Sequence, residues 1–360
     1  MSGVTLHPVT GRRKAHAAAT TIRELASSMG PGWKLPTVVE MCKSLNVAFG
    51  TLDAALTRLE RQGLIERKRG SGIYVSDRIH QKTIGVVFGG DIFSEGFSPF
   101  WSLMLLAVRQ QAGDHRFTPR AFLDVAEGRD GLGGHAQLME DLESRRLHGL
   151  LLFAPLPGQA ATLRSYGVPL VVLCGEDPQD PTVTMDMLAV HPLAARELAA
   201  RGCRRVALMA HHALPHRPAL EGELARAGAP DAEVVDWSYD TWAGIIPGAG
   251  TRERLAHELA RRMIAERHAA PLPDGVLSLD DTMARGLVIA MQQAGLRPGR
   301  DVHVASVVHT GSPVLDLFAR ELIPIEYDPA RIVRAMLTML GELTAGRTLR
   351  ENPVLIGPSR

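Results

Sequence analysis

The sequence predicts a multidomain protein in which a small α+β domain with a two-stranded wing precedes an α/β body of doubly wound parallel sheets. Residues 1–78 hold twelve basic and six acidic side chains, whereas the remainder holds 28 basic and 33 acidic ones. A basic head on a mildly acidic body is typical of a polyanion-binding module joined to another domain. The apolar pattern also changes after about residue 83, and 360 residues suffice for two or three folding units.

Composition narrows the class of protein further. The chain is 45% hydrophobic and 22% charged, which excludes disordered and collagen-like proteins. Cys42, Cys174 and Cys203 lack C-x-x-C spacing, so we expect neither a disulfide framework nor a thiolate zinc site, and a reducing cytoplasm fits best. No stretch of about 18 uncharged apolar residues occurs, so the sequence predicts neither export nor a membrane span.

Three short helices are predicted in the head. Residues 15–29 carry apolar side chains at helical spacing and stop before a Gly-Pro-Gly breaker. Thr37 and Glu40 have the spacing of a capping box, so a second helix should begin at Thr37. Asn46 suits the tight connection that follows, and a third helix should end at Gly63. Two short helices joined by a few residues form a helix-turn-helix.

A two-stranded wing should follow the third helix. Residues 64–67 and 73–75 have strand patterns, and the basic, glycine-rich turn 68–72 joins them. Gly70 and Gly72 could also be taken for a nucleotide-binding loop. They enter a strand instead of a helix, however, so no helix N-terminus is available for a phosphate.

The lead-in "PGWKLPT", the turn and the ending "LERQGLIERKRGSGIYV" resemble the GntR family of winged-helix regulators over about 60 residues. The resemblance implies double-stranded operator DNA as a partner, with the third helix in the major groove and the wing near phosphates or the minor groove. The residues expected to contact DNA are Thr37, Phe49, Thr51, Arg58, Lys68 and Arg69.

The head departs from its family where bases are read. The family usually presents Ser-Arg-Gly-Thr-Val-Arg at the start of the recognition helix, whereas residues 48–53 are Ala-Phe-Gly-Thr-Leu-Asp. The usual Ser-x-Arg before the second helix is Thr-Val-Val at 37–39. Guanine contacts by arginine therefore cannot be carried over. Phe49 could touch a thymine methyl, wedge into the groove or pack on the second helix, and Arg58 could simply be solvated.

The body alternates apolar strands with helices. Strands are predicted at 84–88, 150–153, 170–173, 206–209, 276–277 and 302–304. Helical patterns lie near 100–113, 133–146, 188–201, 217–228, 251–268, 281–295 and 329–345. Continuously apolar strands between helices indicate parallel sheets covered on both faces, and the length of the body favours two lobes.

Nine fragments in order resemble the sugar-sensing domain of the LacI family, a two-lobed fold shared with periplasmic sugar-binding proteins. They are "IGVVF", "SPFW", "LHGLLL", "GVPLVVL", "VTMD", "GCRRVALM", "DWS", "DDTMARGLVIAMQQAGLRPGRDVHV" and "IPIEYDPARIVRAM". The resemblance implies that the chain crosses between the lobes three times. The expected divisions are a DNA-binding domain 1–76, a linker 77–83, a first lobe 84–186 plus 310–323, and a second lobe 187–309 plus 324–360.

In that family a sugar binds between the lobes, so hydroxyl-binding side chains and stacking aromatic rings should meet there. By position the resemblance implies as effector-binding residues Phe100, Trp101, Asp186, Arg217, Trp237, Asp281 and Tyr327. The aromatic residues could instead belong to the core, and Asp281 could cap the helix that begins there. The usual Asp-Asp after the late strand is replaced by Val308-His309-Thr310, which suggests a ligand other than an unmodified pentose or hexose.

The predicted function is a cytoplasmic, dimeric, ligand-responsive transcriptional regulator, more specifically a repressor, without a cofactor. One alternative is a body that docks another protein and binds no metabolite. Another is an enzyme, but no Walker loop, G-x-S-x-G or H-E-x-x-H motif occurs. His211, His212 and His216 could suggest a metal site, yet adjacent histidines on a strand point apart, so we expect no metal.

Overall fold

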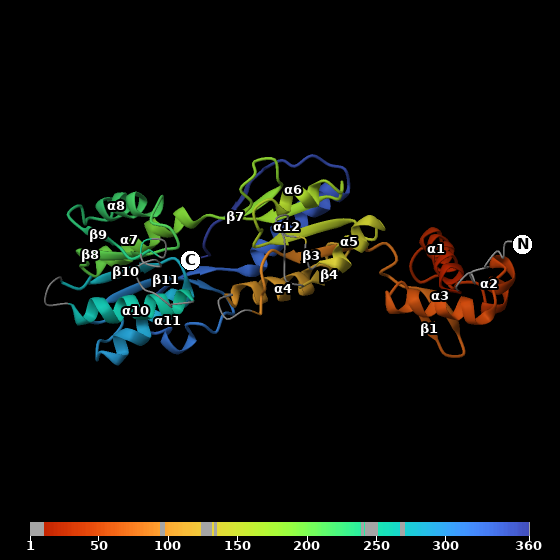
Figure 1. Cartoon of the computed structure of the whole chain (residues 1–360), viewed down its shortest axis with the longest axis horizontal. Helices are drawn as coiled ribbons and strands as arrows, with labels where there is room; N and C mark the ends of the chain where they lie inside the picture. Colours follow the sequence, from red (N-terminus) through yellow and green to blue (C-terminus); the bar gives the residue numbers. More distant parts are fainter. Residues whose placement is uncertain are drawn as a thin grey trace, which may run out of the picture. The chain divides into compact units, whose positions relative to one another are not determined.

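The structure is a computed structural model that describes residues 11–93, 98–123, 132, 135–238, 241, 251–266 and 271–359 (Figure 1). Contacts divide the chain into two compact units. The head comprises Met1–Lys82 with Arg116–Thr118, and the body comprises Thr83–His115 with Pro119–Arg360. None of the described helices combines the length and the apolar character needed to cross a membrane.

The head has the three helices and the wing that the sequence predicts. Its elements are α1 (Gly11–Met29), α2 (Val38–Leu45), α3 (Phe49–Arg61), β1 (Ile65–Lys68) and β2 (Gly72–Val75). The two strands pair antiparallel, with Ile65 opposite Val75. Ile22, Leu52 and Leu59, each at most 1% exposed, lie in the core that the helices share with the wing.

Local chemistry places the ends of these helices as predicted. The Glu40 N–H donates to Thr37 Oγ1 at 3.3 Å, and the Thr37 N–H donates to Glu40 Oε2 at 2.8 Å. The N–H and the hydroxyl of Thr37 both donate to the Glu40 carboxylate and hold the pKa of Glu40 below its ordinary value. Asn46 takes a left-handed conformation after α2, and Gly63 does so after α3 with φ of 69°.

The body contains two separate sheets, which define lobe one and lobe two (Figure 1). Lobe one has six strands in the order β13-β7-β6-β5-β3-β4. They are β3 (Lys82–Phe88), β4 (Phe117–Phe122), β5 (Gly149–Phe153), β6 (Leu170–Leu173), β7 (Thr182–Met185) and β13 (Val354–Ile356). Its helices are α4 (Phe100–Gln111), α5 (Ala136–Glu143), α6 (Gln159–Arg164) and α12 (Pro329–Thr344). Helix α12 packs on β5, β6 and β7 beside α4, while α5 and α6 cover the other face.

Lobe two has five parallel strands in the order β12-β11-β10-β8-β9. They are β8 (Arg205–Met209), β9 (Glu233–Asp236), β10 (Gly275–Ser278), β11 (His303–His309) and β12 (Leu322–Tyr327). Helices α7 (Val190–Ala200) and α8 (His216–Arg226) cover one face, and α10 (Arg252–Ala265) and α11 (Asp281–Gln293) cover the other. Val206 and Leu208 pack under the first pair, and Ala207 and Met209 under the second, which explains why β8 is apolar throughout.

The predicted division of the C-terminal part between the lobes is wrong. Segment 310–323 was assigned to lobe one, but Val314 and Leu315 lie in the lobe-two core and Leu322 and Ile323 pair with β11. Segment 324–360 was assigned to lobe two, which is right for the rest of β12, but α12 packs on the lobe-one sheet and β13 pairs with β7. The burial of apolar side chains explains these positions. The apolar face of α12 is covered by the lobe-one sheet, and the apolar side chains of β12 are buried within lobe two.

The chain passes between the lobes after β7, after β12 and after β13. The first passage runs through the short 3₁₀ helix η1 (Met187–Ala189). At the third, the Ser359 N–H donates to Glu326 O at 2.6 Å, which returns the chain to lobe two. The first two positions of the helix predicted at 133–146 and the last two of that at 251–268 lie outside the described residues.

Candidate functional site

Arg67 ties the wing to α3. Its Nη1 lies 2.8 Å from Asp53 Oδ1, its Nη2 lies 3.0 Å from Thr57 Oγ1, and its Nε lies 3.3 Å from Glu60 Oε2. Three successive turns of α3 therefore hold one guanidinium on β1. This contact fixes how the wing and the helix are placed relative to each other, and the sequence prediction did not identify it.

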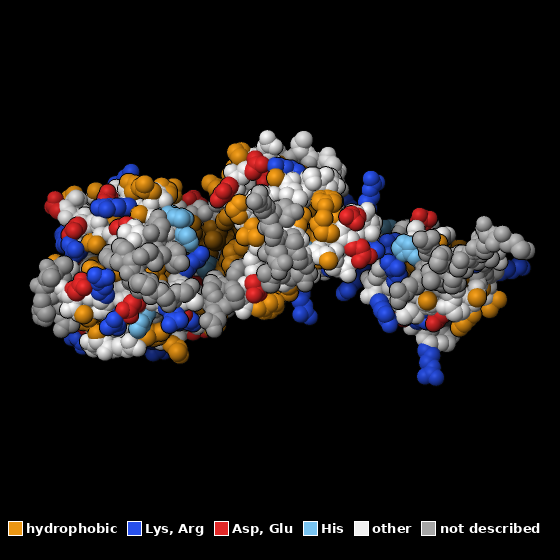
Figure 2. All heavy atoms as spheres, in the orientation of Figure 1, with side chains coloured by type: hydrophobic (Ala, Val, Ile, Leu, Met, Phe, Trp, Pro, Cys, Tyr) orange, Lys and Arg blue, Asp and Glu red, His pale blue; other side chains and the backbone are white. Residues whose placement is uncertain are grey.

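The second strand of the wing, β2, is also bound to the lead-in segment before α2. The Val75 N–H donates to Trp33 O and the Leu35 N–H donates to Ile73 O, both at 2.8 Å, so the lead-in pairs with β2. Lys68 and Arg69 are exposed on the wing, with Lys68 Nζ 4.9 Å from the centre of the Tyr74 ring. Figure 2 shows Lys and Arg side chains projecting from the head.

The residues predicted to contact DNA lie on α2, α3 and the wing. Thr37 is exposed at the start of α2, although its hydroxyl is engaged by Glu40. Phe49 is the first residue of α3 and is 68% exposed, so it does not pack into α2. Thr51 and Arg58 are half-buried on α3, and Arg58 lines a shallow groove of about 510 Å³ along this helix.

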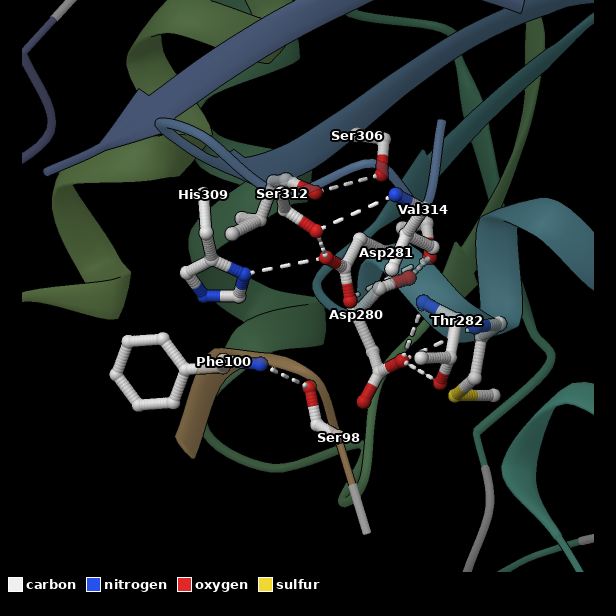
Figure 3. A network of polar contacts seen from close by, with 12 residues as sticks. Ser98, Phe100, Asp280, Asp281, Thr282, Ser306, His309, Ser312 and Val314 are labelled. Atoms are coloured by element: carbon white, nitrogen blue, oxygen red, sulfur yellow. Dashed lines mark hydrogen bonds and ion pairs between the residues drawn. The ribbon is translucent and has the colours of Figure 1, made fainter. Parts of the chain in front are cut away.

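In the body, Asp281 forms the centre of a polar network (Figure 3). It is 2% exposed, lies 3.2 Å from His309 Nδ1 and accepts a hydrogen bond from Ser312 Oγ at 3.3 Å. The alternative role considered for Asp281, capping of α11, is wrong. The cap is Asp280, whose Oδ1 accepts from the Thr282 and Met283 N–H groups.

Asp280 also forms an ion pair with Arg252, whose Nη1 lies 2.8 Å from Asp280 Oδ2. Burial alone would raise the pKa of Asp280, but Arg252 and the donors of α11 hold that pKa below its ordinary value. Because Asp280 takes the capping role, the carboxylate of Asp281 remains available for the network with His309.

Phe100 brings lobe one to this network. It begins α4 and is 4% exposed, and its ring centre lies 4.4 Å from that of His309 (Figure 3). A cavity of about 250 Å³ lies beside Asp281 and His309, and the carboxylates of Asp316 and Glu326 also line it. A cavity of lobe two with several hydrogen-bond acceptors therefore lies next to the contact between His309 and Phe100 of lobe one.

Asp186 and Tyr327 lie where the chain passes between the lobes. The buried Tyr327 hydroxyl donates to the Asp186 backbone carbonyl, and the Asp186 carboxylate accepts from the Ala189 N–H at 3.2 Å. Burial, together with the Asp186 charge, raises the pKa of Tyr327 above its ordinary value. Both residues thus form hydrogen bonds where the chain passes between the lobes.

Two family models match the chain. Residues 16–75 match the bacterial regulatory proteins of the gntR family, and residues 195–360 match a periplasmic binding protein-like domain.

The chain joins a GntR-type DNA-binding domain to a periplasmic binding protein-like sensor domain. This pairing is that of a ligand-responsive transcriptional regulator. A search of the curated proteins found no match.

Solved structures support the two-lobed fold of the sensor domain. A LacI-family regulatory protein from Chloroflexus aggregans is 18% identical over 77% of this chain and 95% of its own, with a TM-score of 0.59. A LacI-type regulator from Alkaliphilus metalliredigens QYMF, complexed with D-xylulofuranose, is 15% identical over 77% and 96%, with a TM-score of 0.56. The lac repressor dimer bound to operator and an anti-inducer is 18% identical over 78% and 92%, with a TM-score of 0.57.

The other predicted effector residues of the sensor domain have different surroundings. Trp101 packs edge-on against Phe88 and Phe100, with ring centres 6.4 and 5.1 Å apart. Trp237 is 2% exposed in the lobe-two core, as the core alternative predicted. Arg217 is exposed and forms an ion pair with Glu221 at 3.0 Å, one turn along α8. Their roles in ligand binding stay predictions.

The network contains two residues that the sequence prediction did not assign to the site, His309 and Ser312. Ser312 donates to Asp281 from the loop after β11, and only its position three residues after His309 could have indicated it. Among the described residues, no three His, Cys, Asp or Glu side chains are grouped so as to hold a metal ion.

Proposed function

We propose that this regulator is a cytoplasmic, dimeric repressor whose head binds operator DNA and whose sensor domain binds a sugar or sugar derivative between its lobes. The observation that carries the proposal is a cavity lined by Asp281 and His309 of lobe two, with Phe100 of lobe one against the His309 ring. Carboxylate oxygens accept hydrogen bonds from hydroxyl groups, and Asp281, Asp316 and Glu326 all line this cavity. The D-xylulofuranose held by a protein of the same fold agrees with this ligand class.

The same contacts suggest how a ligand changes the sensor domain. A hydroxyl that binds Asp281 competes with the donors His309 and Ser312. Since His309 also lies against Phe100 of lobe one, displacing the imidazole alters a contact that spans the lobes. A ligand that favours one arrangement of the lobes shifts the population toward it by its difference in affinity. Two half-sites on an operator then require two heads, and hence a dimer.

The test is a thermal-shift screen of the purified full chain against monosaccharides, disaccharides, uronates and sugar phosphates. A ligand that binds only the folded state raises the melting temperature with its occupancy. We expect a hit that Asp281→Asn abolishes and that Glu258→Gln, on the solvated side of α10, preserves. The same hit should release a selected operator duplex. A panel without any shift, with Asp281→Asn still regulated in cells, would exclude the effector site.

A second candidate function is favoured by a larger cavity of about 690 Å³ in lobe one. Arg331, Arg334 and Arg350 line this cavity together with Glu342 and Glu351, over a floor that includes Met339 and Ile356. Glu342 is held by Arg347, which leaves three arginines against one other carboxylate at the rim. Such a surface suits docking of a protein with an acidic face. Arg334→Glu would weaken that docking and leave any effector shift unchanged.

A further inference from the structure

We propose that the head recognises thymine methyl groups, chiefly through Phe49 and also through Val39, in place of the guanine edges that arginines read. This inference rests on the proposed function, because it requires the head to bind operator DNA. Phe49 begins α3 and is 68% exposed, and Val39 lies in the first turn of α2 and is 78% exposed. Figure 2 shows apolar side chains gathered at the end of the head where α2 and α3 meet.

The two side chains are not needed for the core of the head. Their neighbours Val38 and Val47 pack against the cluster formed by residues such as Leu52 and Leu56, which are at most 1% exposed. Phe49 and Val39 belong neither to that cluster nor to the residues packed on it, among the described residues. An aromatic ring left in water at the tip of a helix contributes nothing to folding, so another apolar group should cover it.

Polar groups for reading guanine are absent from the same end of α3. Residues 49–56 read Phe-Gly-Thr-Leu-Asp-Ala-Ala-Leu and include no Arg, Lys, Asn or Gln. Asp53 is held by Arg67, and Thr51 is half-buried. Among the bases, only thymine presents a methyl group in the major groove. An apolar residue at the N-terminal end of a recognition helix therefore fits an A·T pair.

The basic residues of the head complement this reading without specifying bases. Arg58 and Arg61 lie in the second half of α3, and Lys68 and Arg69 lie on the wing. At these positions they suit phosphates, which supply affinity that does not depend on sequence. The choice among base sequences then depends on Phe49 and Val39.

The test begins with selection of binding sites for the full chain from a random duplex library. Each dT of the selected duplex is then replaced by dU, which removes only the methyl group. We expect one or two positions per half-site at which dU weakens binding about threefold to tenfold, as burial of one methyl group predicts. Phe49→Ala should lose the same factor on the dT duplex and become indifferent to dU at that position.

Two further variants sharpen the result. Trp33→Ala removes another exposed aromatic residue, 64% exposed in the lead-in, and should keep the wild-type response to dU. Phe49→Arg should shift the selected base at the affected position toward guanine. Unchanged melting temperatures would show that the variants fold.

The outcomes separate this inference from the proposed function. Specific selection with equal affinity for dT and dU at every position, or selection that Phe49→Ala leaves intact, would overturn thymine recognition alone. If Phe49→Ala changes self-association while DNA binding stays intact, the patch docks protein and the inference is wrong. A library that yields no enriched sequence would overturn specific DNA binding itself, and the inference with it.

Discussion

Two histidines stack in lobe two at the starts of α7 and α8. The ring centres of His191 and His216 are 5.2 Å apart, with 12° between their planes. Burial, together with the charges of His191 and His212, lowers the pKa of His216 to about 4. Burial also lowers the pKa of His191, against the opposing influence of the Leu188 carbonyl, Glu223 and Asp186. The folded state thus favours two neutral rings.

We expect lobe two to lose stability as the pH falls from about 6.5 toward 4. An unfolded His216 binds its proton near pH 6.5, whereas the folded residue does so only near pH 4. Its contribution is therefore complete above pH 6.5 and is lost below it. The shift corresponds to roughly 3 kcal/mol, which screening by water at this half-buried site reduces to about 2 kcal/mol. Amide hydrogen exchange of β8 and α8 peptides measures this loss. His216→Gln should flatten the pH dependence and His257→Gln on α10 should preserve it, and equal dependence in both would contradict the prediction.

Arg67→Met should destabilise the head by about 1 kcal/mol. The substitution removes the bonds to Asp53, Thr57 and Glu60 but leaves groups that water can reach, so the cost stays small. Calorimetry of the full chain should show the head transition lowered by about 4 to 8 °C. Arg69→Met, on the exposed tip of the wing, should leave the transition in place. Equal melting of both variants would mean that Arg67 does not fix the wing.

At the scale of elements, α11 lies so close to α10 that only glycine fits at position 286. A Cβ atom there would lie 2.2 Å from Glu253 O of α10. Side chains on both helices, such as Leu255, Leu259 and Leu287, fill the rest of this contact. The helix pair supports the start of α11, where Asp280 and Asp281 lie.

Gly286→Ala should therefore cost about 3 kcal/mol of lobe-two stability through the clash with a backbone that cannot move aside. Gly222→Ala, on α8, is the matched control because its Cβ would meet nothing within 4 Å. It should stabilise the lobe by about 0.5 to 1 kcal/mol, since alanine favours a helix. Denaturant unfolding of both variants measures the difference. Similar midpoints would show that α10 moves aside freely.

Elements set by local chemistry were predictable from the sequence. The capping box at Thr37 and the left-handed turns at Asn46 and Gly63 follow from side chains a few residues apart. Strand β4 was not predicted, because its sequence Phe-Thr-Pro-Arg-Ala-Phe contains proline and arginine. The contact of Tyr327 with Asp186 joins residues 141 positions apart and depends on which lobe takes β12. No local pattern encodes such a choice.

At the scale of the whole molecule, the response of the body to a ligand depends on the contacts that join its lobes. Phe100 meets His309 at the network of Asp281, and Tyr327 meets Asp186 at the crossings. The first contact includes His309, which lines the cavity of the candidate ligand site, whereas neither residue of the second contact lines it. A ligand can thus act at one place while the crossings set how readily the lobes rearrange.

Thermodynamic linkage gives the last prediction. If an effector from the screen weakens operator binding by some factor, the operator must weaken effector binding by the same factor, typically 5-fold to 150-fold. Titration calorimetry of the effector, with and without the selected duplex, measures this factor. Tyr327→Phe removes only the hydroxyl that bonds to Asp186 at the crossings, so it should change the coupling factor while the affinity of the DNA-free protein for the effector stays within about twofold. The matched control Tyr166→Phe, in lobe one, should leave both quantities unchanged. An unaltered coupling factor in Tyr327→Phe would show that this bond does not control the rearrangement.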